Sequence, residues 1–265
     1  MNLKFAKMEK DQLSLHAELE LKHWWFRARM KIIKNLLNSI VLPNRNKIIM
    51  DIGCGTGGVI ANLSEEYQVI GIDTSIDCIE VAKNIHSGLN FIHGEFPQDI
   101  PSDNFNASAY LLLDVLEHIN DDIGFFSKSL KAMSPGSYII LTVPASPSLW
   151  SPHDEAYKHF RRYEKNRFEE LWKNLPVEPI FVSYFNTRLF PIIKVLRKIS
   201  IKRNKSIGVA GTDLKMPFKP INYALEVIFS GESNLLLNHL EGNRKTGYSY
   251  GVSLIAILKR NEGSN

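Results

Sequence analysis

The sequence is poor in cysteine. Cys54 and Cys78 are the only two cysteines among 265 residues, too few and too unpatterned for a disulfide framework or a structural zinc site. Cys54 lies within a glycine-rich stretch, where a small residue fits a tight turn. The His, Asp and Glu residues show no convincing metal-ligand spacing either, so we expect chemistry that needs no metal ion.

The chain also lacks a long apolar run. No stretch approaches the ~18 apolar residues of a membrane-spanning helix. The first ten residues contain no apolar core of a signal peptide. We therefore expect a cytoplasmic protein. The length and the proportion of charged residues predict one substantial α/β core rather than two domains with separate cores.

Acidic residues are scarce in one segment. The segment from Thr187 to Pro220 contains nine basic residues and a single acid, Asp213. Its net charge is therefore nine minus one, or +8, whereas the net charge of the whole chain is +4. Apolar and basic residues interleave at roughly helical spacing over 189–201. The segment is therefore either a solvated helix face or a basic amphipathic helix that lies on an anionic membrane surface.

The most informative stretch runs from Asp51 to Gly58 and reads Asp-Ile-Gly-Cys-Gly-Thr-Gly-Gly. It follows the apolar run 48–50 and precedes a helix-like segment. A buried strand that turns through glycines into a helix brings bare backbone and a helix N-terminus against a nucleotide-like ligand. We expect an adenosine-like ligand here, approached closely by the backbone at Gly53, Gly55 and Gly57.

Two cofactor fingerprints fit these residues. The spacing from Gly53 to Gly58 matches a dinucleotide motif, and the spacing from Asp51 to Gly57 matches a methyltransferase motif. The acid at the strand end favours S-adenosylmethionine (SAM), which carries an ammonium and a sulfonium, over the pyrophosphate of NAD. Asp73, followed by Thr74, ends the next strand about 20 residues on, where a carboxylate can take ribose hydroxyls. Both cofactors contain ribose, so Asp73 supports binding without choosing.

Further motifs lie on both sides of this loop. Residues 114–119 read Asp-Val-Leu-Glu-His-Ile after an apolar strand, and residues 23–29 read His-Trp-Trp-Phe-Arg-Ala-Arg. Residues 143–163 contain Val-Pro-Ala, Trp-Ser-Pro-His-Asp and His-Phe-Arg-Arg-Tyr. With these motifs, roughly residues 16–185 resemble the class I SAM-dependent methyltransferases, in particular bacterial small-molecule enzymes of the ubiquinone and menaquinone type. Residues 187–247 carry no motif that we assign.

The resemblance implies an α/β fold: a Rossmann-like seven-stranded sheet of order 3-2-1-4-5-7-6, with strand seven antiparallel and helices on both faces. The alternating periodicities agree with this fold. They predict strands at 47–52, 68–73, 90–94, 107–113, 137–143, 178–185 and 251–259, and helices at 10–40, 57–65, 75–84, 121–132 and 165–174. We divide the chain into an N-terminal helical lid (1–46), a SAM-binding core (47–186), a basic, partly helical insertion (187–247) and a final strand with a tail (248–265).

The resemblance also implies roles in cofactor binding. Glu95 would accept a hydrogen bond from the adenine amino group while Phe96 covers the ring. Leu113 and Asp114, at the end of the fourth strand, would border the adenosine and the reactive methyl group. These assignments rest on residue type and on position after strands three and four.

The helix that precedes the sheet adds one charged candidate. Its Arg29 resembles an arginine that holds the SAM carboxylate, a role that suits a guanidinium. Arg27 is two residues away and cannot share that helix face, so only one of the two arginines should fill the role. Trp24, Trp25 and Phe26 either cover the substrate pocket or belong to the core.

Methyl transfer at a sulfonium carbon is an in-line displacement, so proximity and alignment can supply most of the catalysis. A base is required only for an acceptor that does not ionise easily, such as a sugar hydroxyl. We expect His153 with Asp154 to be the first candidate for this base and His159 the second. His118 lies in the same histidine-rich region, and all of these side chains could instead order their loops through hydrogen bonds.

These observations predict a cytoplasmic SAM-dependent methyltransferase that acts on a small or lipid-linked metabolite, most readily at oxygen, in glycan, quinone or secondary-metabolite biosynthesis. The basic segment predicts peripheral contact with an anionic membrane through 187–220. An NAD-dependent oxidoreductase and a non-catalytic SAM-binding protein remain alternatives. A nucleic-acid methyltransferase is opposed by Asp-Val-Leu-Glu at 114–117, where enzymes that methylate base amino groups carry Asn/Asp-Pro-Pro-Tyr/Phe, so we expect no nucleic-acid partner.

Overall fold

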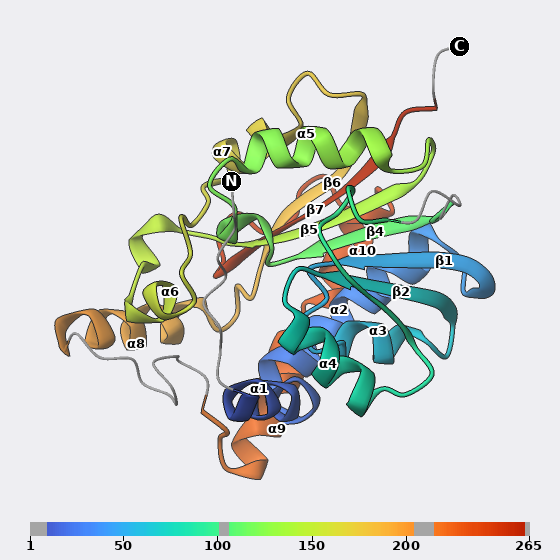
Figure 1. Cartoon of the computed structure of the whole chain (residues 1–265). Coiled ribbons are helices and arrows are strands. Elements are labelled where there is room, and N and C mark those ends of the chain that lie inside the picture. The colour runs from blue at the N-terminus through green and yellow to red at the C-terminus, as the bar shows by residue number, and fades with distance from the viewer. Residues whose placement is uncertain (1–9, 101–105, 204–214, 263–265) are drawn as a thin grey trace.

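The structure is a computed structural model that describes residues 10–100, 106–203 and 215–262 (Figure 1). Its seven strands form one sheet with the order β3-β2-β1-β4-β5-β7-β6. β7 is antiparallel to β5 and β6, whereas the pairs among β1 to β5 are parallel. The predicted order and the reversed last strand are therefore confirmed. The strands are β1 (Asn44–Ile52), β2 (Tyr67–Asp73), β3 (Asn90–His93), β4 (Ala109–Leu113), β5 (Tyr138–Pro144), β6 (Val177–Phe185) and β7 (Ser253–Arg260).

Helices cover both faces of this sheet (Figure 1). β4 is buried along its whole length, and β7 is buried over its first six residues, because the sheet is covered on both sides. One apolar core includes residues of α2, α3 and α4, and the other includes residues of α5 and the segment that follows β5. The helices are α1 (Lys10–Lys22), α2 (Trp24–Ile40), α3 (Gly58–Leu63), α4 (Ile76–Ile85), α5 (Asp122–Ala132), α6 (Pro152–Ala156), α7 (Lys165–Glu169), α8 (Phe190–Arg203), α9 (Lys219–Ser230) and α10 (Ser233–Leu240).

The helical region expected at 10–40 consists of two helices. His23 separates α1 from α2, and its ring nitrogen accepts a hydrogen bond from the backbone N–H of Trp25 at the start of α2. An N-cap of this kind satisfies one of the unpaired N–H groups at a helix start. The break leaves the aromatic first turn of α2 and Arg29 beside the carboxyl ends of the strands, where the site lies.

The insertion before the last strand contains α8, α9 and α10, while its residues 204–214 lie outside the described residues. Both α9 and α10 pack against α2. Glu226 of α9 is buried and forms an ion pair of 2.8 Å with Arg27, and Ser233 of α10 accepts a hydrogen bond from Asn35. The N-terminal helices and the insertion thus form one wall, although about 200 residues separate them in sequence. No described helix is long and apolar enough to cross a membrane.

Candidate active site

A cavity of about 670 Å³ lies at the carboxyl ends of the strands, a volume within the usual range for small-molecule sites. One half is bordered by the turns after β1, β2, β3 and β4. The other half is bordered by the segment after β5, by α8 and by the residues around the start of α9. Such a position, beyond the carboxyl ends of the strands and beside the point where strand order reverses, is where ligands bind in open α/β sheets. The predicted residues that border the cavity are Arg29, Asp51, Gly53, Cys54, Gly55, Asp73, Thr74, Glu95, Phe96, Leu113, Asp114, His153 and His159.

The glycine turn has a different requirement at each of its glycines. All three have positive φ, 76° at Gly53, 53° at Gly55 and 85° at Gly57. A Cβ on Gly53 would lie 2.6 Å from the Val115 side chain, whereas a Cβ on Gly55 would have no atom within 4 Å. Gly55 therefore faces open space in which a ligand can contact the backbone. Gly57 does not border the cavity, because it precedes α3 and a Cβ there would meet Phe91.

Asp73 joins the glycine turn to the second strand. Its Oδ2 accepts a hydrogen bond of 2.9 Å from the Gly55 N–H, and its Oδ1 accepts one of 2.8 Å from the Ser75 N–H. Burial raises the pKa of Asp73, and these two hydrogen bonds oppose the rise. The carboxylate is thus fixed at the cavity wall by the backbone that the fingerprint glycines shape.

Asp51 is a buried acid in the half of the cavity that the turns after β1 to β4 border, which we call the cofactor half. Asp51 is the last but one residue of β1. Burial raises the pKa of its carboxyl group to about 8, and the positive charge of Arg29 opposes this rise. A buried carboxyl of this kind becomes easier to ionise when a cation binds beside it. The site therefore suits a ligand with a positive charge.

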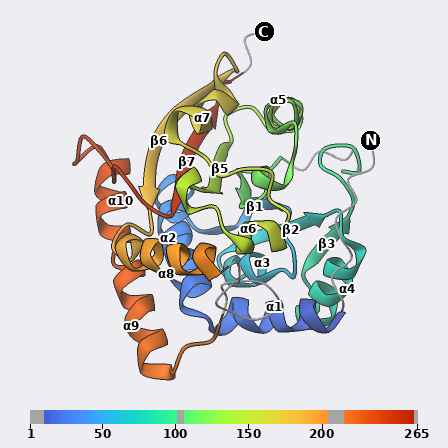
Figure 2. The same ribbon diagram turned by 90° about the vertical axis from the view of Figure 1, so that its left-hand side faces the viewer.

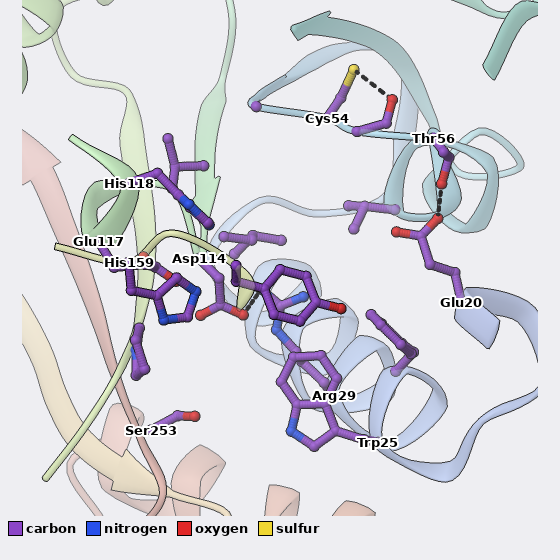
Figure 3. A pocket seen from close by; sticks show the side chains of 18 of the residues that line it. Glu20, Trp25, Arg29, Cys54, Thr56, Asp114, Glu117, His118, His159 and Ser253 are labelled. Carbon is purple, nitrogen blue, oxygen red and sulfur yellow. Dashed lines mark hydrogen bonds and ion pairs between the residues drawn. The ribbon is translucent and has the colours of Figure 1, made fainter. Parts of the chain in front are cut away.

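Arg29 occupies the middle of the cavity wall (Figure 3). Its Nη2 lies 2.8 Å from Asp114 Oδ2 and donates a hydrogen bond of 3.0 Å to Thr142 Oγ1. The guanidinium also lies 5.0 Å from the Trp25 ring centroid, and its buried Nε has no hydrogen-bond partner. Arg27 instead pairs with Glu226, so of these two arginines only Arg29 borders the cavity.

The turn after β3 places Glu95 and Phe96 together. Glu95 borders the cavity, and its Oε1 accepts a hydrogen bond from Gln98. Phe96 is buried, with its ring centroid 6.0 Å from that of Tyr110. A carboxylate next to an apolar ring is the combination that an adenine amino group and ring face would need.

The aromatic residues at the start of α2 belong both to the cavity and to the core. Trp24, Trp25 and Phe26 all border the cavity, and the rings of Trp25 and Phe26 meet edge-on with centroids 4.8 Å apart. Trp24 and Trp25 also pack against the apolar core. The two tryptophans therefore contact the core and the cavity at once, and their cover of a substrate remains a prediction.

The histidines gather in the other half of the cavity. His118 and His159 lie near each other (Figure 3), and their rings meet edge-on with centroids 4.7 Å apart. Nδ1 of His159 lies 3.1 Å from Asp154 Oδ1. Burial lowers the pKa of His118 to about 3 and lowers that of His153 well below the ordinary value. The ring of His159 contacts Asp154, so the structure adds His159 with Asp154 as a candidate pair beside the expected His153 with Asp154.

Asp154 does not border the cavity. It is fully buried, lies 2.7 Å from Arg162 Nε and 3.1 Å from Arg197 Nη1, and accepts a hydrogen bond from the Ser151 N–H. Burial alone would raise its pKa, but the hydrogen bond from His159 and the charges of both arginines hold the pKa well below the usual range. Asp154 therefore positions His159 and does not itself reach a ligand.

Two buried polar residues of the cavity wall were missed by sequence reasoning. Glu117 is 1% exposed and its Oε2 has no partner; burial, together with the nearby Asp114, raises its pKa well above the ordinary value. Asn186, directly after β6, has φ 55° and neither side-chain polar atom is paired. Glu117 lies within a motif that we had quoted, whereas no sequence signal marks Asn186. Unpaired buried polar atoms in a cavity wall are available to a ligand.

One group of side chains bears on the expectation of metal-free chemistry. Glu117, His118 and His159 place one ligand atom each within 4.8 Å of one another, a grouping that could hold a cation. The separation of His159 from the other two in sequence hides this grouping. The same side chains could instead form hydrogen bonds to a bound molecule.

The chain matches a known family over most of its length. Residues 14–188 match the family described as "Methyltransferase domain". Ajmaline N-methyltransferase from Rauvolfia serpentina is 24% identical over 206 residues, 67% of this chain and 70% of that protein. Malonyl-(acyl-carrier protein) O-methyltransferase from Buchnera aphidicola is 23% identical over 226 residues, 77% of this chain and 89% of that protein. The match to norajmaline N-methyltransferase, also from Rauvolfia serpentina, spans 40% of that relative.

Solved structures share the fold. One is the plantazolicin methyltransferase BpumL in complex with S-adenosylhomocysteine (SAH), with a TM-score of 0.58 at 16% identity. The match covers 97% of this chain and 92% of the BpumL chain. The cyclase SpnF has a TM-score of 0.54 at 12% identity, covering 88% and 81%. The family match decides between the two cofactor fingerprints in favour of SAM. The chain belongs to the class I SAM-dependent methyltransferases.

Proposed function

We propose that this methyltransferase transfers the methyl group of SAM to an oxygen atom of a small or lipid-linked metabolite, within EC 2.1.1. The observation that carries the proposal is the His159–Asp154 pair. It puts an imidazole, oriented by a buried carboxylate, on the wall of the same cavity that the glycine turn enters.

The residues of the cofactor half fit SAM. Gly55 faces open space, Asp51 is a buried acid suited to a cation, and Arg29 has a buried Nε without a partner. We assign the ribose to Asp73 and Thr74, the adenine to Glu95 and Phe96, and the amino-acid end to Asp51 and Arg29. When bound, SAM supplies a methyl group on a positively charged sulfur.

His159 would act on the acceptor. Because its Nδ1 side is occupied by Asp154, the hydrogen sits on Nδ1 and Nε2 remains the basic nitrogen. Nε2 would take the proton of the acceptor hydroxyl, and Asp154 would stabilise the imidazolium that forms. Bound SAM would supply the methyl group, whose bond to sulfur is exchanged for the bond to oxygen, and would leave as S-adenosylhomocysteine. The positive charges of Arg162 and Arg197, which both form ion pairs with Asp154, keep its carboxyl group ionised for this task.

The other half of the cavity, bordered by the segment after β5, by α8 and by α9, we call the acceptor half. Its walls indicate the kind of molecule that fits. Apolar side chains from Leu189, Ile193 and Leu225 line it beside the unpaired polar atoms of Glu117 and Asn186. We infer an acceptor with a large apolar part and at least two hydrogen-bonding groups. Molecules of this kind occur among glycan-lipid precursors, quinone precursors and secondary metabolites.

The test uses ¹³C-methyl-labelled SAM with extracts of cells that carry the gene. The carbon chemical shift of the product methyl group distinguishes O-, N- and C-methylation. His159→Gln should lower the rate by about 10²- to 10⁴-fold, the usual contribution of a general base. SAM affinity should not change, and His153→Gln is the matched control. A methyl group on carbon or nitrogen would contradict the proposal.

The same experiment addresses a protein that binds SAM without using it. Calorimetric titration should show micromolar binding of SAM and of SAH. If SAM binds and no extract becomes labelled, the alternative of a non-catalytic SAM-binding protein is favoured. A chain that does not bind SAM would fail the proposal altogether.

A further inference from the structure

The outer side of α8 presents an apolar stripe. Its residues recur at spacings of three and four, which places them on one face of a helix. They are Ile192, Val195, Leu196 and Ile199, and they are 39–57% exposed. A helix face of this composition is normally buried against another surface.

A basic stripe runs beside the apolar one. Lys194, Lys198 and Lys202 are exposed and follow one another at a spacing of four. The third side of the helix faces the protein, where Arg197 is buried against Asp154. α8 therefore has an inward face, an outward apolar face and a basic flank, which is the pattern of helices that lie in a membrane interface.

α9 also exposes apolar side chains. Ile221, Tyr223 and Val227 are 49–68% exposed, while its acid Glu226 points inward to Arg27. Phe218, immediately before the helix, is 74% exposed. In Figure 2, α8 crosses the side of the molecule turned towards the viewer, and α9 lies below it, further from the viewer. We call the exposed apolar residues of these two helices, together with Phe218, the docking surface.

The docking surface leads into the cavity. Ile192 and Leu196 are exposed and at the same time border the cavity, as two sides of one wall. Pro217 and Leu225 border it from the α9 side. Apolar side chains of α8 and α9 thus border the cavity, next to the exposed Lys215.

We propose that the docking surface binds an anionic lipid membrane and that a lipid-linked acceptor enters the cavity between α8 and α9. Charge supports a membrane over a second copy of this chain. No acidic side chain is exposed among the described residues of 187–230, so two copies meeting here would bring lysines against lysines. Anionic headgroups complement those lysines while the apolar stripe enters the headgroup region. The entry of the acceptor rests on the proposed function, whereas the docking does not.

The first experiment is co-sedimentation of the full chain with vesicles. Vesicles of phosphatidylcholine alone should bind weakly, and vesicles with about one third phosphatidylglycerol should bind strongly at low salt and much less at high salt. Changing Lys194, Lys198 and Lys202 together to Gln should weaken this binding at least about tenfold. The matched control changes Lys128, Lys131 and Lys173, exposed lysines in and after α5, to Gln, and should bind like the unchanged chain.

A second set of variants tests the apolar part. Val195→Ser with Ile199→Ser keeps every charge, should keep SAM affinity, and should also weaken vesicle binding. No binding of the unchanged chain at low salt, or an equal loss in the control, would overturn the docking. Light scattering tests whether a second copy of the chain binds this surface instead. If the unchanged chain forms a dimer, does not bind vesicles, and becomes monomeric in the serine variant, the surface is a dimer interface. Because SAM titration is independent of vesicles, failure of the proposed function is recognised separately.

Discussion

Arg29 Nη2 lies 2.8 Å from Asp114 Oδ2, so a residue of the N-terminal helices is tied to the end of β4 in the centre of the sheet. Thr142 at the end of β5 contacts both partners, with hydrogen bonds of 3.0 Å and 3.1 Å. Asp114 has a φ of 59°, a conformation that non-glycine residues adopt rarely and that clusters at functional sites. The pair joins the two halves of the cavity.

Arg29→Ala should weaken SAM more than it weakens 5′-methylthioadenosine, which lacks the amino-acid end. The expected difference is about 1.5 to 3 kcal/mol, the contribution of a hydrogen bond to a charged group. Calorimetric titration of both ligands measures it. Arg27→Ala, which removes a charge on the outer side of the same helix, serves as the control. Equal losses for both ligands would show that Arg29 has a structural role only.

Asp51 should make stability depend on pH. The folded carboxyl keeps its proton up to about pH 8, whereas an unfolded aspartate loses it near pH 4. Between these values the folded state binds more protons, so the contribution of Asp51 to the free energy of unfolding falls as pH rises, by up to about 1.4 kcal/mol per pH unit. Asp51→Asn should flatten the curve obtained by urea unfolding across this range.

The same group should couple SAM binding to a proton. A cation beside Asp51 favours the ionised form, so binding near neutral pH should release a proton from the unchanged chain and none from Asp51→Asn. Calorimetry in two buffers of different ionisation enthalpy measures this release. An identical heat difference in both proteins would exclude Asp51 as the source.

Asp154→Ala should destabilise the fold strongly. It would leave Arg162 and Arg197 buried without their carboxylate, and breaking a buried ion pair costs about 3 to 5 kcal/mol. Chemical denaturation monitored by tryptophan fluorescence gives the value. His159→Gln, which leaves both arginines paired with Asp154, should cost far less. A small loss in Asp154→Ala would mean that solvent reaches the two arginines.

Removal of divalent cations should leave methyl transfer unchanged, because the proposed base is His159 and SAM carries its own activated carbon. The assay compares the rate before and after dialysis against EDTA. Loss of activity that one divalent ion restores would instead identify Glu117, His118 and His159 as its ligands. Glu117→Gln would then abolish the restoration.

The sequence predicted the positions of the strands because apolar runs are local patterns, while the family resemblance supplied their order. The roles of the cofactor-binding residues remain predictions. The strand-glycine-helix pattern around Gly53 and the acid of Asp73 belong to neighbouring stretches of chain, and the positions of all seven strands follow from apolar runs. The acceptor half depends on contacts between distant segments. His159 meets His118 across 41 residues, and Asn186 reaches the cavity wall from the end of β6, so neither position could be read from spacing.

The wall shared by α2 and the insertion also constrains how this enzyme can diverge. Arg27 and Asn35 on α2 hold Glu226 and Ser233 on α9 and α10, so the acceptor side is built by two stretches that only fit each other. A chimaera that receives the insertion of a relative should fold well only if residues 24–40 travel with it. Substrate range would then evolve through paired exchanges at both ends of the chain, while the glycine turn between them stays as it is.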